Sequence, residues 1–207
     1  MLGWLKGMLR LLRLKNSVPE GMGRVKGGHV RMPGGTLAFV LPFELDLRPV
    51  TNREYLGFIQ AKRRRTPDWM HRRGFDDPDQ PVVGITYPEA RAYARWAGKR
   101  LPTEAEWIRA ARAGSKKPFP WGEAFPQQGL AWVEAGPKGA PASVEDPRAR
   151  LGGAGPYGHR DLIGNVWEWI ACGSLKGGFW GLGKSIDERL EDKKDRLSAG
   201  YGFRCAS

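Results

Sequence analysis

The sequence predicts an α+β domain in which compact helices come before a second half of short strands and loops. Two observations support this fold class. Three Thr-x-x-Glu patterns, at Thr51, Thr86 and Thr103, have the spacing of a capping box, in which threonine and glutamate satisfy backbone N–H groups at a helix start. From Ser115 onward, glycine and proline recur too often for long regular elements. Helices followed by short strands favour an antiparallel sheet over alternating β–α–β units.

Strands are expected to open the domain. Residues 21–35 are rich in glycine and lack periodicity, which indicates turns. The apolar run 36–41, just before Pro42, has the length of a strand.

Apolar spacing defines the inward face of each predicted helix. The first helix should bury Tyr55, Phe58 and Ile59 before it frays into the basic run 62–65. The second and third helices should end at glycines, because a glycine after a helix adopts the left-handed conformation at low cost. Those glycines are Gly98 and Gly114, and the other inward-facing residues are Ala90, Tyr93, Ala94, Ala97, Trp107, Ala110 and Ala111.

Residues 1–18 predict a separate basic amphipathic helix, because Lys6, Arg10 and Arg13 recur at helical spacing among leucines and methionines. We favour packing of this helix on the domain or on a second copy, since glycines weaken it in isolation; residues 1–15 could instead contact an anionic membrane surface. Its charges exclude a membrane span, and no small-residue cleavage site follows. We therefore expect a cytoplasmic protein.

Length and charge limit the possible organisation. A chain of 207 residues and 23.1 kDa has room for one domain, 19–207, beside the N-terminal helix. The net charge is +12, and residues 1–100 hold 19 basic but only 9 acidic side chains. The basic runs lack interleaved aromatic residues, so a solvated face is expected rather than a nucleic-acid interface. Arginine-rich charges and prolines in loops also fit a thermophile protein.

Cysteine and histidine usage excludes several kinds of site. Only Cys172 and Cys205 are present, which rules out a disulfide-dense scaffold and a multi-cysteine zinc site. The three histidines, His29, His71 and His159, have no HxH or HxxxH spacing. We expect them to be exposed or core residues rather than metal ligands.

Five ordered blocks carry a specific resemblance. They are PVTNREY (49–55), WAGKRLPTEAEW (96–107), FPWG (119–122), GNVWEW (164–169) and GFRC (202–205). In order and spacing, over about residues 30–207, they resemble the formylglycine-generating enzyme (sulfatase-modifying factor) family. The resemblance implies a C-type-lectin-like fold with a small antiparallel sheet and extensive loops, in agreement with the α+β class and about three helices.

The resemblance also implies an oxidase chemistry for which this chain lacks the ligands. Family members that make formylglycine bind copper between two cysteines that follow a Gly-Gly-Ser motif, and Cu(I) prefers thiolates. Here the motif reads Gly177-Gly178-Phe179, and the two cysteine positions fall on Leu182 and Asp187. We therefore expect no copper and no catalytic residue, and we do not expect Cys172 or Cys205 to substitute.

A calcium site is a further implication of the resemblance. The positions that match the family's site at the GNVWEW loop are Asp161, Gly164, Val166 and Glu168. Two carboxylates and two backbone carbonyls are the hard oxygen ligands that Ca²⁺ prefers. The alternative is a cation-free loop in which both carboxylates bind backbone groups.

The segment 174–201 is the candidate ligand-binding surface. The chain also resembles the variable proteins of diversity-generating retroelements, which use the same fold and in which the segment before the Gly-Phe-Arg block binds ligand. Aromatic residues among small ones are typical of a paratope. Alternatively, Trp180 packs in the core, and Phe179 and Leu182 fill a vacated catalytic pocket. The candidate residues are Phe179, Trp180, Gly181, Leu182, Lys184, Ser185, Ile186, Asp187, Leu197 and Tyr201.

These observations predict a noncatalytic module that binds a protein or another macromolecule through its C-terminal surface. Two alternatives remain. One is a copper-dependent formylglycine-generating oxidase, and the other is a structural domain whose N-terminal helix docks on a membrane or a larger assembly.

Overall fold

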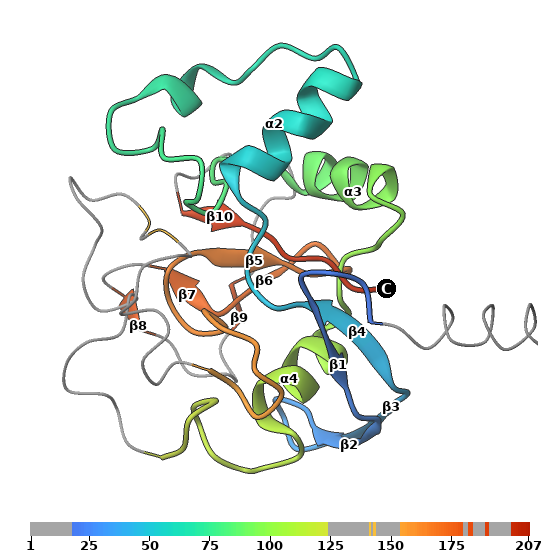
Figure 1. Ribbon diagram of the computed structural model, residues 1–207. Helices are drawn as coiled ribbons and strands as arrows, with labels where there is room; N and C mark the ends of the chain where they lie inside the picture. The colour runs from blue at the N-terminus through green and yellow to red at the C-terminus, as the bar shows by residue number, and fades with distance from the viewer. Residues whose placement is uncertain are drawn as a thin grey trace, which may run out of the picture.

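The computed structural model describes residues 18–123, 154–179 and 200–207, together with positions 141, 143, 182–183 and 189–190 (Figure 1). The predicted helix over 1–18 lies outside the described residues except for its last position. The helices are α2 (Asn52–Ala61), the 3-10 helix η1 (Asp68–His71), α3 (Tyr87–Trp96) and α4 (Glu104–Arg112). The strands are β1 (Met22–Val25), β2 (Gly28–Arg31), β3 (Leu37–Val40), β4 (Phe43–Asp46), β5 (Trp167–Trp169), β6 (Leu175–Lys176), β7 (Gly178–Phe179), β8 (Leu182–Gly183), β9 (Arg189–Leu190) and β10 (Tyr201–Gly202).

The three predicted capping boxes begin α2, α3 and α4. At α4 the Thr103 N–H donates to the Glu106 carboxylate at 2.8 Å, and the Glu106 N–H donates to the Thr103 hydroxyl at 3.2 Å. Thr51 and Glu54 make the same reciprocal bonds at α2, and α3 begins on the third pattern. Each box satisfies backbone donors that a helix start would leave without partners.

The second and third helices end at the positions predicted from their glycines. α3 stops just before Gly98, which has a φ of +70°, and α4 stops before Ala113 and Gly114, at +51° and +86°. These left-handed residues turn the chain out of each helix.

The strands form small sheets. β1 pairs with β4, β2 with β3, and β7 with β8, all antiparallel, while a four-stranded sheet has the order β10-β5-β6-β9. The parallel β10–β5 pair departs from the expected antiparallel arrangement. Parallel neighbours need a long connection between them, and residues 170–200 supply it.

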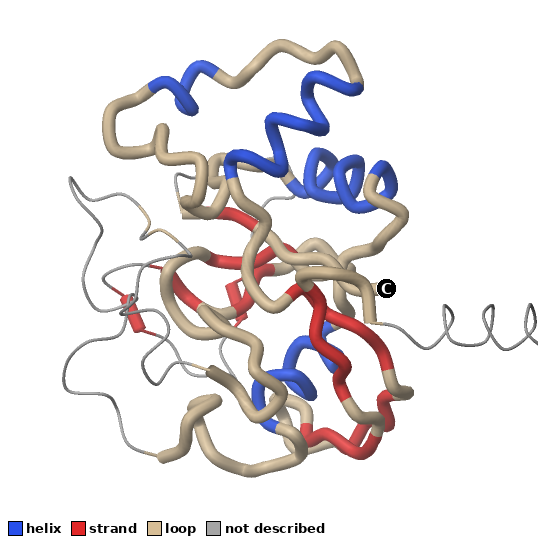
Figure 2. The backbone as a smooth tube through the Cα atoms, viewed as in Figure 1, coloured by secondary structure: helices blue, strands red, loops and turns tan. Residues whose placement is uncertain are grey.

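Helices cover the strands from two sides (Figure 2). One apolar cluster lies between α2, α3 and the four-stranded sheet, and a second joins α4 to β1–β4. The predicted inward-facing residues are buried, apart from Ala97, which is half-buried. The core therefore confirms the helical periodicity read from the sequence.

The apolar run 36–41 forms β3 but is not buried as a unit. Leu37, Phe39 and Leu41 are 64%, 62% and 72% exposed, whereas Val40 is buried. A two-stranded hairpin offers only one face to the core, so alternate side chains project outward.

His159 is the buried histidine of the three. Its Nε2 lies 3.2 Å from the Leu45 carbonyl oxygen, and burial lowers its pKa to about 4. The ring is therefore neutral at pH 7, as expected of a core residue.

The predicted basic run 62–65 is exposed, with Arg64 lying 5.1 Å from the ring centre of Phe58. Within the described ranges, no helix combines the length and apolarity that a bilayer crossing demands.

The capping boxes yield a stability prediction. Replacing Thr103 by alanine removes the cap of α4, and we expect a loss of about 1 kcal/mol in the free energy of unfolding, measured by urea denaturation. The matched control is Thr36→Ala at an exposed turn residue, which should change stability by less than about 0.5 kcal/mol. Equal losses in both variants would contradict a capping role for Thr103.

Candidate functional site

The predicted ligand-binding segment leaves the four-stranded sheet after β6, rejoins it at β9 and ends in it at β10 (Figure 1). Within it β7 pairs with β8, so Phe179 is opposite Leu182 in antiparallel register, and β9 pairs with β6. Two of the predicted residues are thus neighbours in one hairpin. The others before Tyr201 lie outside the described residues: Trp180, Gly181, Lys184, Ser185, Ile186, Asp187 and Leu197.

Tyr201 belongs at least partly to the frame that carries the segment. It pairs with Trp167 in the sheet, and its half-buried ring meets the Trp169 ring edge-on at 5.5 Å between centroids. Its contribution to a ligand surface is therefore limited to the face that Trp169 leaves uncovered.

Gly177 shows why a glycine is required between β6 and β7. Its φ is +97°, and a Cβ at this position would lie 2.8 Å from the Leu162 carbonyl oxygen. The Gly177 carbonyl accepts from the Gly164 N–H at 2.6 Å. Only glycine fits both the backbone conformation and the close approach, which ties the hairpin to the loop before β5.

A buried ion pair lies beneath this loop, between Glu168 of β5 and Arg204. The Arg204 Nε and Nη2 donate to the two Glu168 carboxylate oxygens at 2.7 and 2.6 Å, and both side chains are buried. The Trp107 indole N–H donates to the same carboxylate at 2.9 Å. Sequence reasoning missed this pair; the available signal was one charged residue within each of two apolar blocks, WEW and GFRC.

Arg204 also binds three backbone carbonyls. Its guanidinium donates to the carbonyl oxygens of Asp46, Arg160 and Asp161 at 3.2, 2.8 and 3.2 Å. Together with Glu168, five oxygen atoms surround one permanently charged group. This contact set joins β4, β5 and the loop before β5 around a single side chain.

Lys176 is a second buried cation that sequence reasoning missed. Its ammonium lies 3.5 Å from the Glu104 carboxylate and 5.7 Å from the ring centre of Trp107. The side chain is fully buried at the end of β6. Lys176 and Arg204 therefore flank Trp107 and Glu168, and each cation has an acidic partner.

The predicted calcium ligands lie in a tight loop. Asp161 and Asn165 have positive φ angles of 55°, and the Gly164 carbonyl accepts from the Val166 N–H at 2.7 Å. The Oδ2 atom of Asp161 is buried without a hydrogen-bond partner. Burial raises the pKa of Asp161 to about 6.

Among the four predicted calcium ligands, the two carboxylates differ in their availability to a cation. The free Asp161 oxygen is compatible with a bound cation. Both oxygens of Glu168 already accept from Arg204, so a calcium ion there would have to share or displace a guanidinium. In the described part of the chain, no three His, Cys, Asp or Glu residues gather as a metal site. The set as a whole does not fit calcium with Glu168 so engaged, and calcium stays a prediction of the resemblance.

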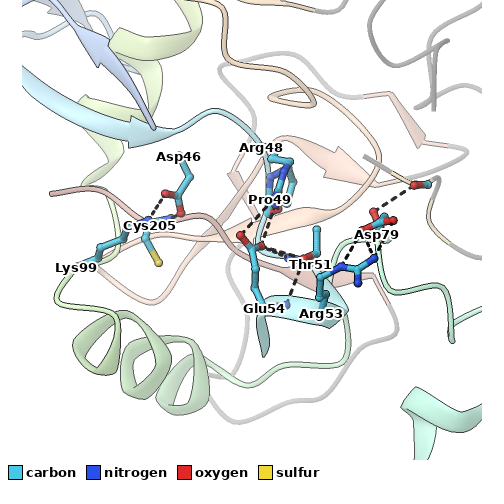
Figure 3. Close-up of polar contacts among 10 residues, drawn as sticks. Asp46, Arg48, Pro49, Thr51, Arg53, Glu54, Asp79, Lys99 and Cys205 are labelled. Carbon is cyan, nitrogen blue, oxygen red and sulfur yellow. Dashed lines mark hydrogen bonds and ion pairs between the residues drawn. The ribbon is translucent and has the colours of Figure 1, made fainter. Parts of the chain in front are cut away.

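The two cysteines are free and occupy unlike environments. Cys205 is buried beside Asp46, whose carboxylate accepts from the Cys205 N–H at 2.8 Å and from the Lys99 ammonium at 2.6 Å (Figure 3). Burial and the neighbouring Asp46 raise the pKa of the Cys205 thiol well above its usual range. Cys172 is exposed in the turn after β5.

Comparison with known proteins places this geometry in a family. The family model described as "Sulfatase-modifying factor enzyme 1-like domain" matches residues 15–207. The "Inactive C-alpha-formylglycine-generating enzyme 2" of Bos taurus is 30% identical and aligns with 96% of this chain and 91% of its own length. The "Formylglycine-generating enzyme" of Thermomonospora curvata is 34% identical, covering 93% of this chain and 86% of its own.

The fold is also similar to that of solved structures. "Treponema denticola variable protein 1" superposes with a TM-score of 0.69 at 16% sequence identity, covering 89% of this chain and 94% of that one. At this identity the likeness shows the fold alone. It agrees with the predicted α+β, C-type-lectin-like class.

The buried ion pair generates a double-variant prediction. Arg204→Met leaves the Glu168 carboxylate buried without a counter-charge, and we expect a loss of about 3–5 kcal/mol in the free energy of unfolding. Adding Glu168→Gln should recover at least about 1 kcal/mol, because the orphaned charge disappears. Urea denaturation measures both, with folded yield as the second readout.

The control for this pair is Arg24, which forms an exposed ion pair with Glu44 at 2.9 Å. Arg24→Met should cost less than about 1 kcal/mol. A double variant no more stable than Arg204→Met alone would contradict the coupling.

Proposed function

The chain belongs to the family of sulfatase-modifying factor enzyme 1-like domains, and on that premise we propose that it is a noncatalytic ligand-binding protein. In this proposal the segment 174–201 is the binding surface, and a protein or another macromolecule is the ligand. The relation to a diversity-generating retroelement, as in the variable proteins that share the fold, is part of the same proposal.

The state of the cysteines is the observation that carries the proposal. An oxidase of this family needs two adjacent thiolates for copper, and the resemblance places them at Leu182 and Asp187. Of the two cysteines that the chain does have, Cys205 is buried and its pKa is raised, so its thiol stays protonated at pH 7. Cys172 is exposed and free, which leaves one accessible thiol where the chemistry needs two.

The names of the relatives are consistent with a noncatalytic role without deciding it. One relative of nearly full coverage is named as inactive, and another of similar coverage is named as an active enzyme. The scaffold thus accommodates both states. Whether a given chain carries the copper-binding cysteines has to distinguish an active member from an inactive one.

The arrangement of the frame supports a separate binding surface. Both ends of the segment are held by buried contacts: Leu175 and Lys176 of β6 on one side, and Phe203 and Arg204 after β10 on the other. Loops held by such a frame tolerate many side chains, since they contribute little to the core.

An aerobic assay tests the noncatalytic assignment. The protein is loaded with Cu(I) and mixed with a peptide that carries a sulfatase-type cysteine motif, and mass spectrometry follows loss of the thiol and gain of the aldehyde. We expect no aldehyde above background, while an active formylglycine-generating enzyme processed in parallel gives product. Aldehyde formed by the folded protein would refute the assignment.

A substitution series tests the separation of surface and frame. Lys184→Ala, Ser185→Ala and Asp187→Ala should each change the free energy of unfolding by less than about 0.5 kcal/mol. Leu175→Ala, at a buried position of β6 where the segment joins the frame, should cost about 2–5 kcal/mol. Comparable losses in the two sets would assign the segment to the core and remove the basis for a tolerant surface.

A further inference from the structure

A cavity lies between α3, the start of α4 and the turn after β5. Its volume is about 520 Å³. In Figure 1 α3 lies to the upper right of the sheet and the β7–β8 hairpin to its left. The ring and charged lining residues of the cavity are Tyr87, Arg91, Arg95, Lys99, Arg100 and Glu106.

The lining of this cavity carries unbalanced positive charge. Four of its side chains are basic and one, Glu106, is acidic. Glu106 is already bound to Arg100, with both N···O distances 2.7 Å. Lys99 is held by Asp46 at 2.6 Å. The remaining two, Arg91 and Arg95, are exposed and form no ion pair within the described residues.

Arg91 and Arg95 stand four residues apart on α3, so their side chains lie on the same face of the helix. Two like charges at this spacing repel each other and destabilise a helix. An anion placed between them would remove that repulsion. The planar guanidinium matches phosphate and carboxylate groups with two parallel hydrogen bonds.

The cavity wall is fixed before any ligand arrives. The Tyr87 hydroxyl donates to the Ala171 carbonyl, and the Ala171 N–H donates to the Pro102 carbonyl at 2.8 Å. These bonds join α3, the turn after β5 and the loop before α4. Arg91 in turn lies 5.5 Å from the ring centre of Tyr87, which limits its rotation.

We propose that this cavity is a binding site for a small organic ligand with two or more phosphate or carboxylate groups. The volume falls in the range of small-molecule sites, about 300–1,000 Å³. Arg91 and Arg95 bind the anionic groups, and the organic part lies against the apolar floor formed by the buried Leu101 and Ala94. The described lining of the site contains no residue of the proposed C-terminal ligand surface.

The experiment uses pyrophosphate and citrate as probes, titrated into the whole protein by calorimetry. Arg91→Gln/Arg95→Gln should weaken binding of the better probe at least about tenfold, because two charge-assisted contacts disappear. The control is Arg72→Gln/Arg73→Gln, two exposed arginines outside the cavity, which remove the same charge and should change binding less than about twofold.

Each outcome decides a point. Preference for pyrophosphate assigns a phosphate ligand, and preference for citrate assigns a carboxylate ligand. Equal weakening of binding in both double variants would show general charge attraction and overturn the site. The site would also be overturned if neither pyrophosphate nor citrate bound at about 10 mM. Backbone amide shifts in NMR spectra should appear at Ala94, Leu101 and Ala171, and shifts located elsewhere also overturn it.

Discussion

The Glu168–Arg204 ion pair is the contact on which the remaining structure depends. Removing two charges from water is costly, and the cost is offset only when every hydrogen-bonding position is filled. Arg204 meets that condition with five oxygens from β4, β5 and the loop before β5, and Trp107 adds α4 through Glu168. The pair therefore makes the two apolar clusters cooperative, because the elements that supply its partners belong to both of them.

This constraint separates the molecule into a frame and the parts attached to it. β6 and β10 flank β5, so a long excursion of the chain begins and ends beside the buried charges. The Arg-lined cavity, in contrast, is built on α3 and the turn after β5. Among the described residues, the two proposed surfaces share one frame but no lining side chain.

Local signals were sufficient to predict the helices but not the charge network. Capping boxes fixed the helix starts, and Gly98 and Gly114 their ends, because both effects act within one helical turn. The pairing of Arg204 with Glu168 and the burial of Lys176 depend on tertiary packing between distant segments. The exposure of Leu37 and Phe39 also depends on tertiary packing, because an apolar run in the sequence does not indicate which face of the strand will be covered.

The position of Arg204 along the chain has a consequence for synthesis. Every partner of its guanidinium is translated earlier, and the segment 174–201 lies between most of the frame and the residue that closes it. A frameshift or a stop codon within that segment would yield a chain without Arg204, Phe203 and Cys205, whose core could not close. Stable folding thus requires that the reading frame is kept through the segment. Only an mRNA that preserves this frame encodes a protein whose core can form.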